Sequence, residues 1–213
     1  GHMGYKESIE MFLWGNRVAT LFTYRDIRDV AVSLTHHIVD GHGAHSHPEW
    51  YKELGYERAL LAVIEGLTGH DDENERDIHY AGVIERWNQY AGWLGVDWVE
   101  KFRFEDLITD REAQAKRIVN YVVAFAATAR GYNFRIEEEA MAEAVSRMVE
   151  FSGKTDKSPT FRKGVSGEWR NEFTPEAVAA FKAQDERWAE EAGIDEGSWL
   201  VHLGYEQDKD WAL

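Results

Sequence analysis

Two short apolar runs constrain the fold of this chain more than any other feature, because they have the clearest β-strand composition. Arg17–Tyr24 (RVATLFTY) predicts a buried strand rich in β-branched and aromatic residues, and Asp97–Phe104 (DWVEKFRF) predicts a second strand. Helical spacing occupies much of the remaining chain, over about 49–67, 75–94, 110–130, 136–151 and 175–192. Strands separated by helices favour the α/β class with a parallel sheet, and the length fits one domain over residues 1–213.

Local signals predict where several elements begin and end. Either Asp26 or Asp29 can cap a helix that follows the first strand. The segment Thr35–Trp50 reads as a loop because it contains two glycines and a proline. Thr174 followed by Pro175 is a typical helix start, with threonine at the N-cap and proline in the first turn.

The charge of the chain excludes one class of partner. There are 24 Lys and Arg against 39 Asp and Glu, which gives a net charge of −15. A nucleic-acid-binding protein needs a broad basic face, so nucleic acid is not an expected partner. One small anionic ligand in a local basic pocket is still compatible, because distant charges are screened.

Other bulk features set the expected compartment. The sequence has no cysteine, so it cannot form disulfides or zinc–thiolate sites. No apolar run approaches the roughly 18 residues that suggest a membrane span, and no secretory signal is visible. We therefore expect a cytoplasmic protein without a membrane span.

A basic cluster lies where the first strand meets the following helix. Arg25 and Arg28 are three residues apart, and Ser33 follows eight positions after Arg25. Open α/β sheets bind ligands at the carboxyl ends of their strands, where a guanidinium and a hydroxyl together suit a phosphate. The alternative is that both arginines pair with neighbouring acids such as Asp26 and Asp29.

A second basic cluster is the compact turn Arg162-Lys163-Gly164. The glycine would let backbone N–H groups approach an anion closely. Trp169 and Phe173 are apolar anchors for the same segment. The alternative is a solvated basic loop, which becomes less attractive once both clusters offer the same kind of donor.

These segments resemble those of a known family. Arg25–Ser33 (RDIRDVAVS) is similar to a signature segment of sulfotransferases that use 3′-phosphoadenylyl sulfate (PAPS), and Phe102–Leu107 (FRFEDL) resembles their (R/F)YEDL strand end. Phe161–Thr174 (FRKGVSGEWRNEFT) resembles their RKGxxGDWKNxFT segment. The resemblance covers about residues 17–176 in family order. It implies a P-loop-type three-layer α/β fold with a central parallel sheet and many helices.

The resemblance also implies roles for individual residues. Arg25 and Ser33 match the pair that holds the 3′-phosphate of the nucleotide. The residues matching the turn that closes over the same phosphate are Arg162, Lys163 and Gly164. Phe104 matches an aromatic residue beside the adenine that is usually tyrosine, so ring contact remains without a hydroxyl. Ile27 replaces a common proline.

The start of the chain departs from the family pattern. The family's first strand and its PKSGT loop, whose lysine and amides bind the 5′-phosphosulfate, do not precede Arg17, so the sequence looks N-terminally incomplete. Gly153-Lys154-Thr155 does not replace this loop, because the Walker pattern needs a glycine where Met148 stands.

The catalytic base has one candidate. The family uses a histidine a little over twenty residues before the strand-end arginine, and His2 lies 23 positions before Arg25. Two interpretations remain open: His2 is that base, or Gly-His-Met is a cloning remnant. A histidine suits the role because its pKa of about 6.5 lets it accept a hydroxyl proton near neutral pH.

A histidine-rich segment follows the first helix and contains His36, His37, His42, His45 and His47. Imidazole is a common metal ligand, but His-x-His without a placed carboxylate is a weak metal pattern. We favour histidines on the acceptor side or the surface and expect no metal.

The leading hypothesis is therefore a PAPS-dependent sulfotransferase that releases PAP and acts on a hydroxyl or amine of a small-molecule acceptor. The alternatives are a degenerate or truncated nucleotide-binding domain without catalysis, and a small-molecule kinase, which would need a Walker lysine. As protein partners we consider a homodimer or a missing N-terminal segment.

Overall fold

The computed structural model describes residues 3–41, 46–131, 136–152, 164–205 and 211. Residue contacts divide the chain into two compact units that alternate along the sequence. Unit 1 contains residues 1–25 and 90–164, and unit 2 contains residues 26–89 and 165–213. The prediction of a single domain over residues 1–213 stays a prediction.

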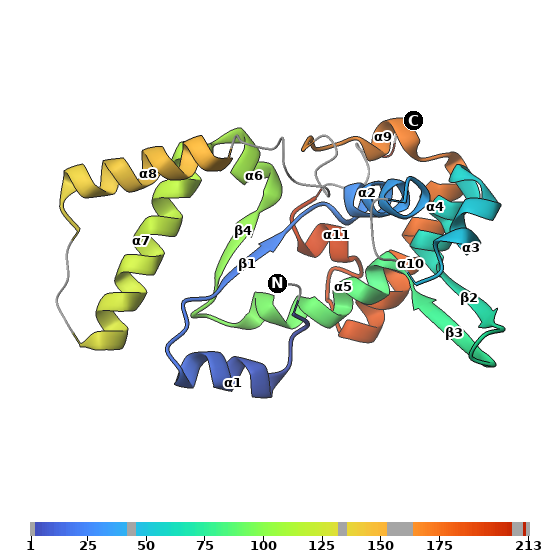
Figure 1. The fold of residues 1–213 in the computed structure, drawn as a ribbon, viewed down its shortest axis with the longest axis horizontal. Coiled ribbons are helices and arrows are strands. Elements are labelled where there is room, and N and C mark those ends of the chain that lie inside the picture. Colours follow the sequence, from blue (N-terminus) through green and yellow to red (C-terminus); the bar gives the residue numbers. More distant parts are fainter. Residues whose placement is uncertain (1–2, 42–45, 132–135, 153–163, 206–210, 212–213) are drawn as a thin grey trace. The chain divides into compact units, whose positions relative to one another are not determined.

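Unit 1 is built around a parallel pair of strands, β1 (Leu21–Tyr24) and β4 (Glu100–Arg103), which run side by side in Figure 1. Its other elements are α1 (Glu7–Gly15), the short 3₁₀ helix η1 (Gly92–Gly95), α6 (Phe104–Thr109), α7 (Arg111–Arg130) and α8 (Glu138–Ser152). Trp93, Val96 and Val99 form a buried cluster against which α1 packs Ile9 and Leu13. Burial of this apolar surface is what holds α1 beside the strands.

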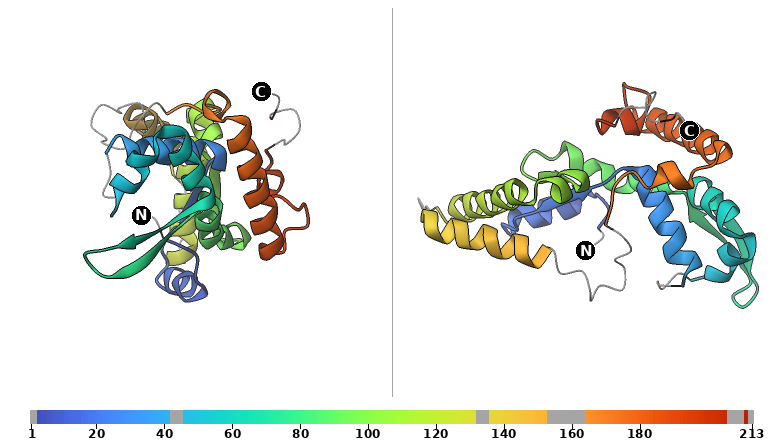
Figure 2. Two further views of the ribbon diagram at one scale, coloured as in Figure 1. Left: turned by 90° about the vertical axis from the view of Figure 1, so that its right-hand side faces the viewer. Right: turned by 90° about the horizontal axis from the view of Figure 1, so that it is seen from above.

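Unit 2 is mainly helical and carries an antiparallel hairpin. Its elements are α2 (Ile27–Val39), α3 (Pro48–Leu54), α4 (Tyr56–Glu65), β2 (Gly66–Asp71), β3 (Arg76–Ala81), α5 (Val83–Ala91, whose last two residues count with unit 1), α9 (Trp169–Glu172), α10 (Pro175–Ala192) and α11 (Trp199–His202). Helix α4 packs against α2, α3 and α10, as Figure 2 also shows. The core between them includes the fully buried side chains Val32, Leu60 and Phe181.

The α/β class with a parallel strand pair is confirmed, and several predicted boundaries hold. Asp26 is the N-cap of α2 and accepts a hydrogen bond from the Arg28 amide. The predicted helix over about 110–130 is α7, which Gly131 ends in a left-handed conformation with φ of 68°. The Thr174 hydroxyl caps α10 by accepting from the Ala177 amide, with Pro175 in the first turn.

Several boundary predictions are wrong, including that of the second strand, which spans Glu100–Arg103 rather than Asp97–Phe104. The first strand starts at Leu21 and alternates between exposed and half-buried residues, because Arg17 belongs to the turn that ends α1. The predicted loop from Thr35 begins later, because α2 continues to Val39 with Thr35 and Ile38 buried on its apolar side. The hairpin β2–β3 replaces the start of the helix predicted over about 75–94.

The hairpin was missed because its sequence carries little apolar alternation. Most of β2 and β3 is exposed or half-buried, so neither strand needs a regular apolar face. Its boundaries depend on glycine instead. Gly66 has a φ of 99°, and a Cβ at Gly82 would lie 2.4 Å from the Ile64 carbonyl oxygen. Only glycine satisfies both positions without a backbone shift.

Within the described residues, no helix is both long and apolar enough to cross a membrane.

A buried carboxylate joins α10 to α11 in unit 2. The Asp185 side chain, 1 % exposed, accepts hydrogen bonds from the Ser198 hydroxyl at 2.5 Å and from the Trp199 amide at 3.0 Å. We expect Asp185→Ala to lower the free energy of unfolding by about 2–4 kcal/mol, because two buried donors lose their acceptor. Urea denaturation measures this loss. The exposed neighbour change Glu186→Ala should stay within about 0.5 kcal/mol of wild type, and an equally small effect of Asp185→Ala would contradict the assignment.

Candidate nucleotide site

Two of the predicted site residues meet at one edge of the parallel strand pair. Tyr24 of β1 is in register with Arg103 of β4, so Arg25 and Phe104 are the residues that directly follow this last pair. The Arg25 guanidinium carbon lies 4.7 Å from the centroid of the Phe104 ring. The carboxyl edge of the strands therefore presents a cation and an aromatic face beside each other, which is a combination that suits a phosphate and a base.

Arg28, the second arginine of the same stretch, is buried and bonded to neighbouring side chains. Its side chain is 1 % exposed and binds the Asp26 carboxylate, with Nε 2.9 Å from Oδ1 and Nη2 2.7 Å from Oδ2. Its guanidinium also lies 4.0 Å from the Trp169 ring centroid. The ion-pair alternative considered for both arginines is therefore correct for Arg28.

Asp29 connects the two signature segments, and sequence reasoning considered it only as a helix cap or an ion-pair partner. This buried carboxylate accepts hydrogen bonds from the Gly167 amide at 2.7 Å and the Trp169 amide at 3.1 Å. The bonds span 138 and 140 residues of sequence. The signal that could have indicated this role is an acid placed among the buried positions of an apolar helix face.

The remaining predicted site residues are placed as follows. Ser33 is half-buried on α2 in unit 2, whereas Arg25 and Phe104 belong to unit 1, so its part in the same site stays a prediction. Gly164 has a φ of 60°, a conformation that favours glycine. Arg162, Lys163 and His2 lie outside the described residues.

His36, in the histidine-rich segment, has protein partners. Its Nε2 lies 3.4 Å from Glu172 and its Nδ1 lies 3.6 Å from Asp40. His42 and His45 are not among the described residues. Across the described ranges, no three histidine or acidic side chains come together in a way that could hold a metal ion.

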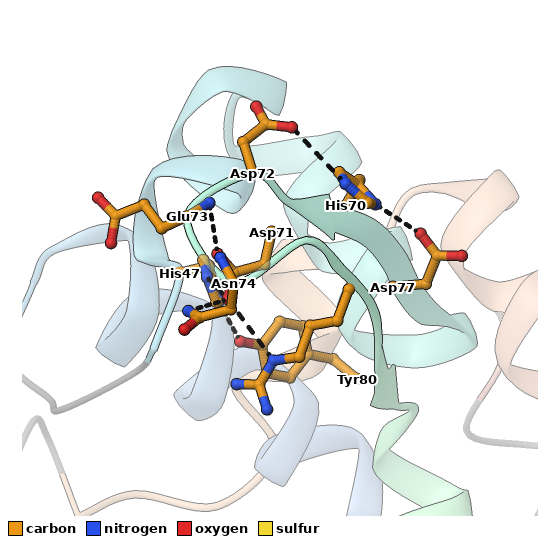
Figure 3. A network of polar contacts seen from close by, with 9 residues as sticks. His47, His70, Asp71, Asp72, Glu73, Asn74, Asp77 and Tyr80 are labelled. Atoms are coloured by element: carbon orange, nitrogen blue, oxygen red, sulfur yellow. Dashed lines mark hydrogen bonds and ion pairs between the residues drawn. The ribbon is translucent and has the colours of Figure 1, made fainter.

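His47, at the other end of the segment, belongs to the network of the hairpin. Its Nδ1 shares a hydrogen bond of 2.5 Å with the Tyr80 hydroxyl, and its Nε2 lies 3.6 Å from the Asp71 carboxylate. The imidazole also stacks on Trp50, with ring centroids 4.3 Å apart. Figure 3 shows His47, Asp71 and Tyr80 gathered at the base of the turn between β2 and β3.

Asp71 organises this turn. Its carboxylate accepts hydrogen bonds from the backbone amides of Glu73 and Asn74 and from the Asn74 side chain. The Asn74 side-chain bond is the largest of the effects that lower the pKa of Asp71, and the nearby His47 adds to it. The network holds the hairpin turn in one conformation.

Comparison with known proteins identifies the family to which the chain belongs. The model of the sulfotransferase domain matches residues 2–192. The chain belongs to the sulfotransferase domain family. Among solved structures, the crystal structure of mouse sulfotransferase SULT7A1 complexed with PAP matches with a TM-score of 0.55 and 18 % sequence identity, over 96 % of this chain and 68 % of that chain. No curated protein sequence matches this chain.

The family assignment confirms the resemblance, and the structural match confirms the α/β fold. At this level of identity the match shows a shared fold and carries no residue roles. The matched range includes His2 as well as both segments tied together by Asp29. The sulfotransferase domain therefore covers every residue predicted for the site.

Removing the Asp29 carboxylate should weaken the link between the signature segments. We expect Asp29→Ala to lower the free energy of unfolding by about 2–4 kcal/mol, because two backbone N–H groups lose their acceptor. Asp29→Asn should cost less, since its amide oxygen still accepts one bond. Guanidinium denaturation gives both values, with Asp40→Ala, at the exposed end of α2, as the control. If Asp29→Ala matched that control, the link would not contribute to stability.

The hairpin network predicts a dependence on pH. The pKa of Asp71 is lower in the folded protein, so its stabilising contribution is present above the unfolded pKa of about 3.9 and is lost as the pH falls through the folded value. An NMR titration of the Asp71 carboxyl should give a midpoint below 3.9. Asn74→Ala should move that midpoint upward, because it removes the main stabilising hydrogen bond. A midpoint at or above the ordinary value in the unmodified protein would contradict the network.

Proposed function

We propose that this sulfotransferase-family chain transfers a sulfuryl group from PAPS to a hydroxyl or amine of a small molecule and releases PAP. The observation that carries the proposal is the meeting of Arg25 and Phe104 at the carboxyl edge of the strands. Membership of the sulfotransferase family supports the same chemistry independently.

Arg25 is the proposed ligand of the 3′-phosphate. A guanidinium can form two parallel charge-assisted hydrogen bonds with a phosphate, and its place directly after β1 puts it at the edge where open α/β sheets bind ligands. Ser33 would add a hydroxyl donor. Phe104 would contact the adenine through its ring alone, because it lacks the tyrosine hydroxyl.

The second signature segment supplies the remaining proposed phosphate ligands, Arg162, Lys163 and Gly164. The attachment of Gly167 to Asp29 supports this assignment, because it fixes the chain three residues after Gly164 and next to the start of α2. The φ of 60° at Gly164 also supports a turn whose amides can face an anion.

Catalysis needs a base for the acceptor proton, and we assign this role to His2, which lies inside the range matched by the family. A neutral imidazole can accept a proton from a hydroxyl near neutral pH. When bound, PAPS supplies the sulfuryl group. The scheme uses no metal. The net charge of −15 favours neutral or cationic acceptors, and we place the acceptor near the histidine segment that follows α2.

Binding of PAP tests the nucleotide site directly. We expect PAP to bind the unmodified chain in a calorimetric titration and Arg25→Ala to weaken binding about 10- to 100-fold, because a charge-assisted contact is lost. Arg147→Ala is the matched control, since this arginine is 70 % exposed on α8 and pairs with Glu143 on the same helix. Unchanged affinity of Arg25→Ala would refute the assignment of Arg25. Absence of PAP binding to the unmodified chain would refute the proposed co-substrate.

A further inference from the structure

A cavity lies in unit 1, at the end of β1 and β4 opposite to the proposed nucleotide residues. It has a volume of about 550 Å³, within the usual range for small-molecule sites. Its walls come from the end of α1, the residues that lead into β4, and one face of α7. On α7 the lining residues recur at helical spacing and include two small side chains that leave room: Tyr121, Ala124, Phe125, Thr128 and Ala129.

Three aromatic rings form one wall of this cavity. The Trp14 ring lies 5.3 Å from Trp98 and 6.4 Å from Phe125, and Trp98 lies 6.2 Å from Phe125, measured between centroids. Trp98 is held in place through its carbonyl oxygen, which accepts a hydrogen bond of 2.9 Å from the Tyr121 hydroxyl. Trp14 nevertheless remains 55 % exposed, so a large aromatic face is open to a ligand.

The charged groups around the cavity differ in whether they have a hydrogen-bond or ion-pair partner. Arg17 donates a hydrogen bond to the Ala129 carbonyl near the end of α7, and Glu100 pairs with Arg117 at 2.6 Å. Asp97, which is exposed, has no hydrogen-bond or ion-pair partner among the residues that the structure describes. Beside the aromatic wall, the cavity therefore offers one carboxylate that is not neutralised by the protein.

We infer that this cavity binds an organic cation with an aromatic body, such as an arylalkylamine. Tryptophan faces attract ammonium groups through their ring quadrupole and stack with aromatic rings. Asp97 provides the opposite charge for the ammonium group. Both features select the same ligand class. The Arg17 guanidinium also lines the cavity, but it is held by the Ala129 carbonyl.

The cavity is separate from the proposed nucleotide site. Trp14 and Asp97 precede β1 and β4, whereas Arg25 and Phe104 follow them. The four residues of each strand keep these two edges about 13 Å apart. A ligand in the cavity would therefore leave the nucleotide residues accessible, so this site is neither the nucleotide site nor part of it.

The probe for this inference is 2-phenylethylamine, compared with the neutral analogue 2-phenylethanol. Binding is followed by shifts of the Trp14 and Trp98 indole NMR signals, with each signal assigned by substitution. We expect the amine to bind about 3- to 10-fold more tightly than the alcohol, because only the amine gains the cation–π and carboxylate interactions. Shifts that are absent at saturating millimolar probe, or equal affinities for the two probes, would overturn the inference.

Two variants locate the site. Ala124→Phe fills the cavity from the α7 face and should abolish binding of both probes. Asp97→Asn should reduce the preference for the amine to the part that the ring faces provide, while leaving 2-phenylethanol binding unchanged. Asp72→Asn, an exposed acid on the hairpin, should leave the full preference intact. Thermal denaturation checks that each variant is folded, and PAP affinity should equal that of the unmodified chain. Binding that survives Ala124→Phe, or an amine preference that is unchanged by Asp97→Asn, would contradict the assigned cavity.

Discussion

The hydrogen bonds of Asp29 are the constraint that joins two segments of unit 2 that lie far apart in the sequence. This buried carboxylate at the start of α2 accepts hydrogen bonds from the backbone amides of Gly167 and Trp169. These residues lie 138 and 140 positions further along the sequence. Trp169 is then fully buried and receives the Arg28 guanidinium on its ring. Because an ionised carboxylate is costly to bury without donors, the second segment and the first stabilise each other.

Two arginines three residues apart have different surroundings in the structure. Arg28 lies inside the first turn of α2, where Asp26 is the N-cap and provides an adjacent carboxylate. Arg25 lies one residue before that cap, at the end of β1, and its guanidinium faces the Phe104 ring. The same residue type is thus committed to the fold in one case and placed at the sheet edge in the other. We base the nucleotide proposal on Arg25.

The sequence predicted features that depend on local chemistry. Thr174 with Pro175 predicted the start of α10, and two apolar runs predicted the parallel pair β1 and β4. It did not predict features that arise from tertiary contacts. The hairpin β2–β3 depends on Gly66 and Gly82 and on the polar network of Asp71, rather than on an apolar repeat. Similarly, Asp29 accepts hydrogen bonds from the backbone amides of Gly167 and Trp169, and this distant segment becomes its neighbour only in the folded chain.

We propose that residues of both signature segments bind the same nucleotide. Hydrogen–deuterium exchange with and without PAP tests this claim most directly. We expect slower exchange in peptides that contain residues 24–33, 102–106 and 161–169, and no change in peptides from α8. Protection confined to α1 and α7, or no protection at saturating PAP, would contradict it.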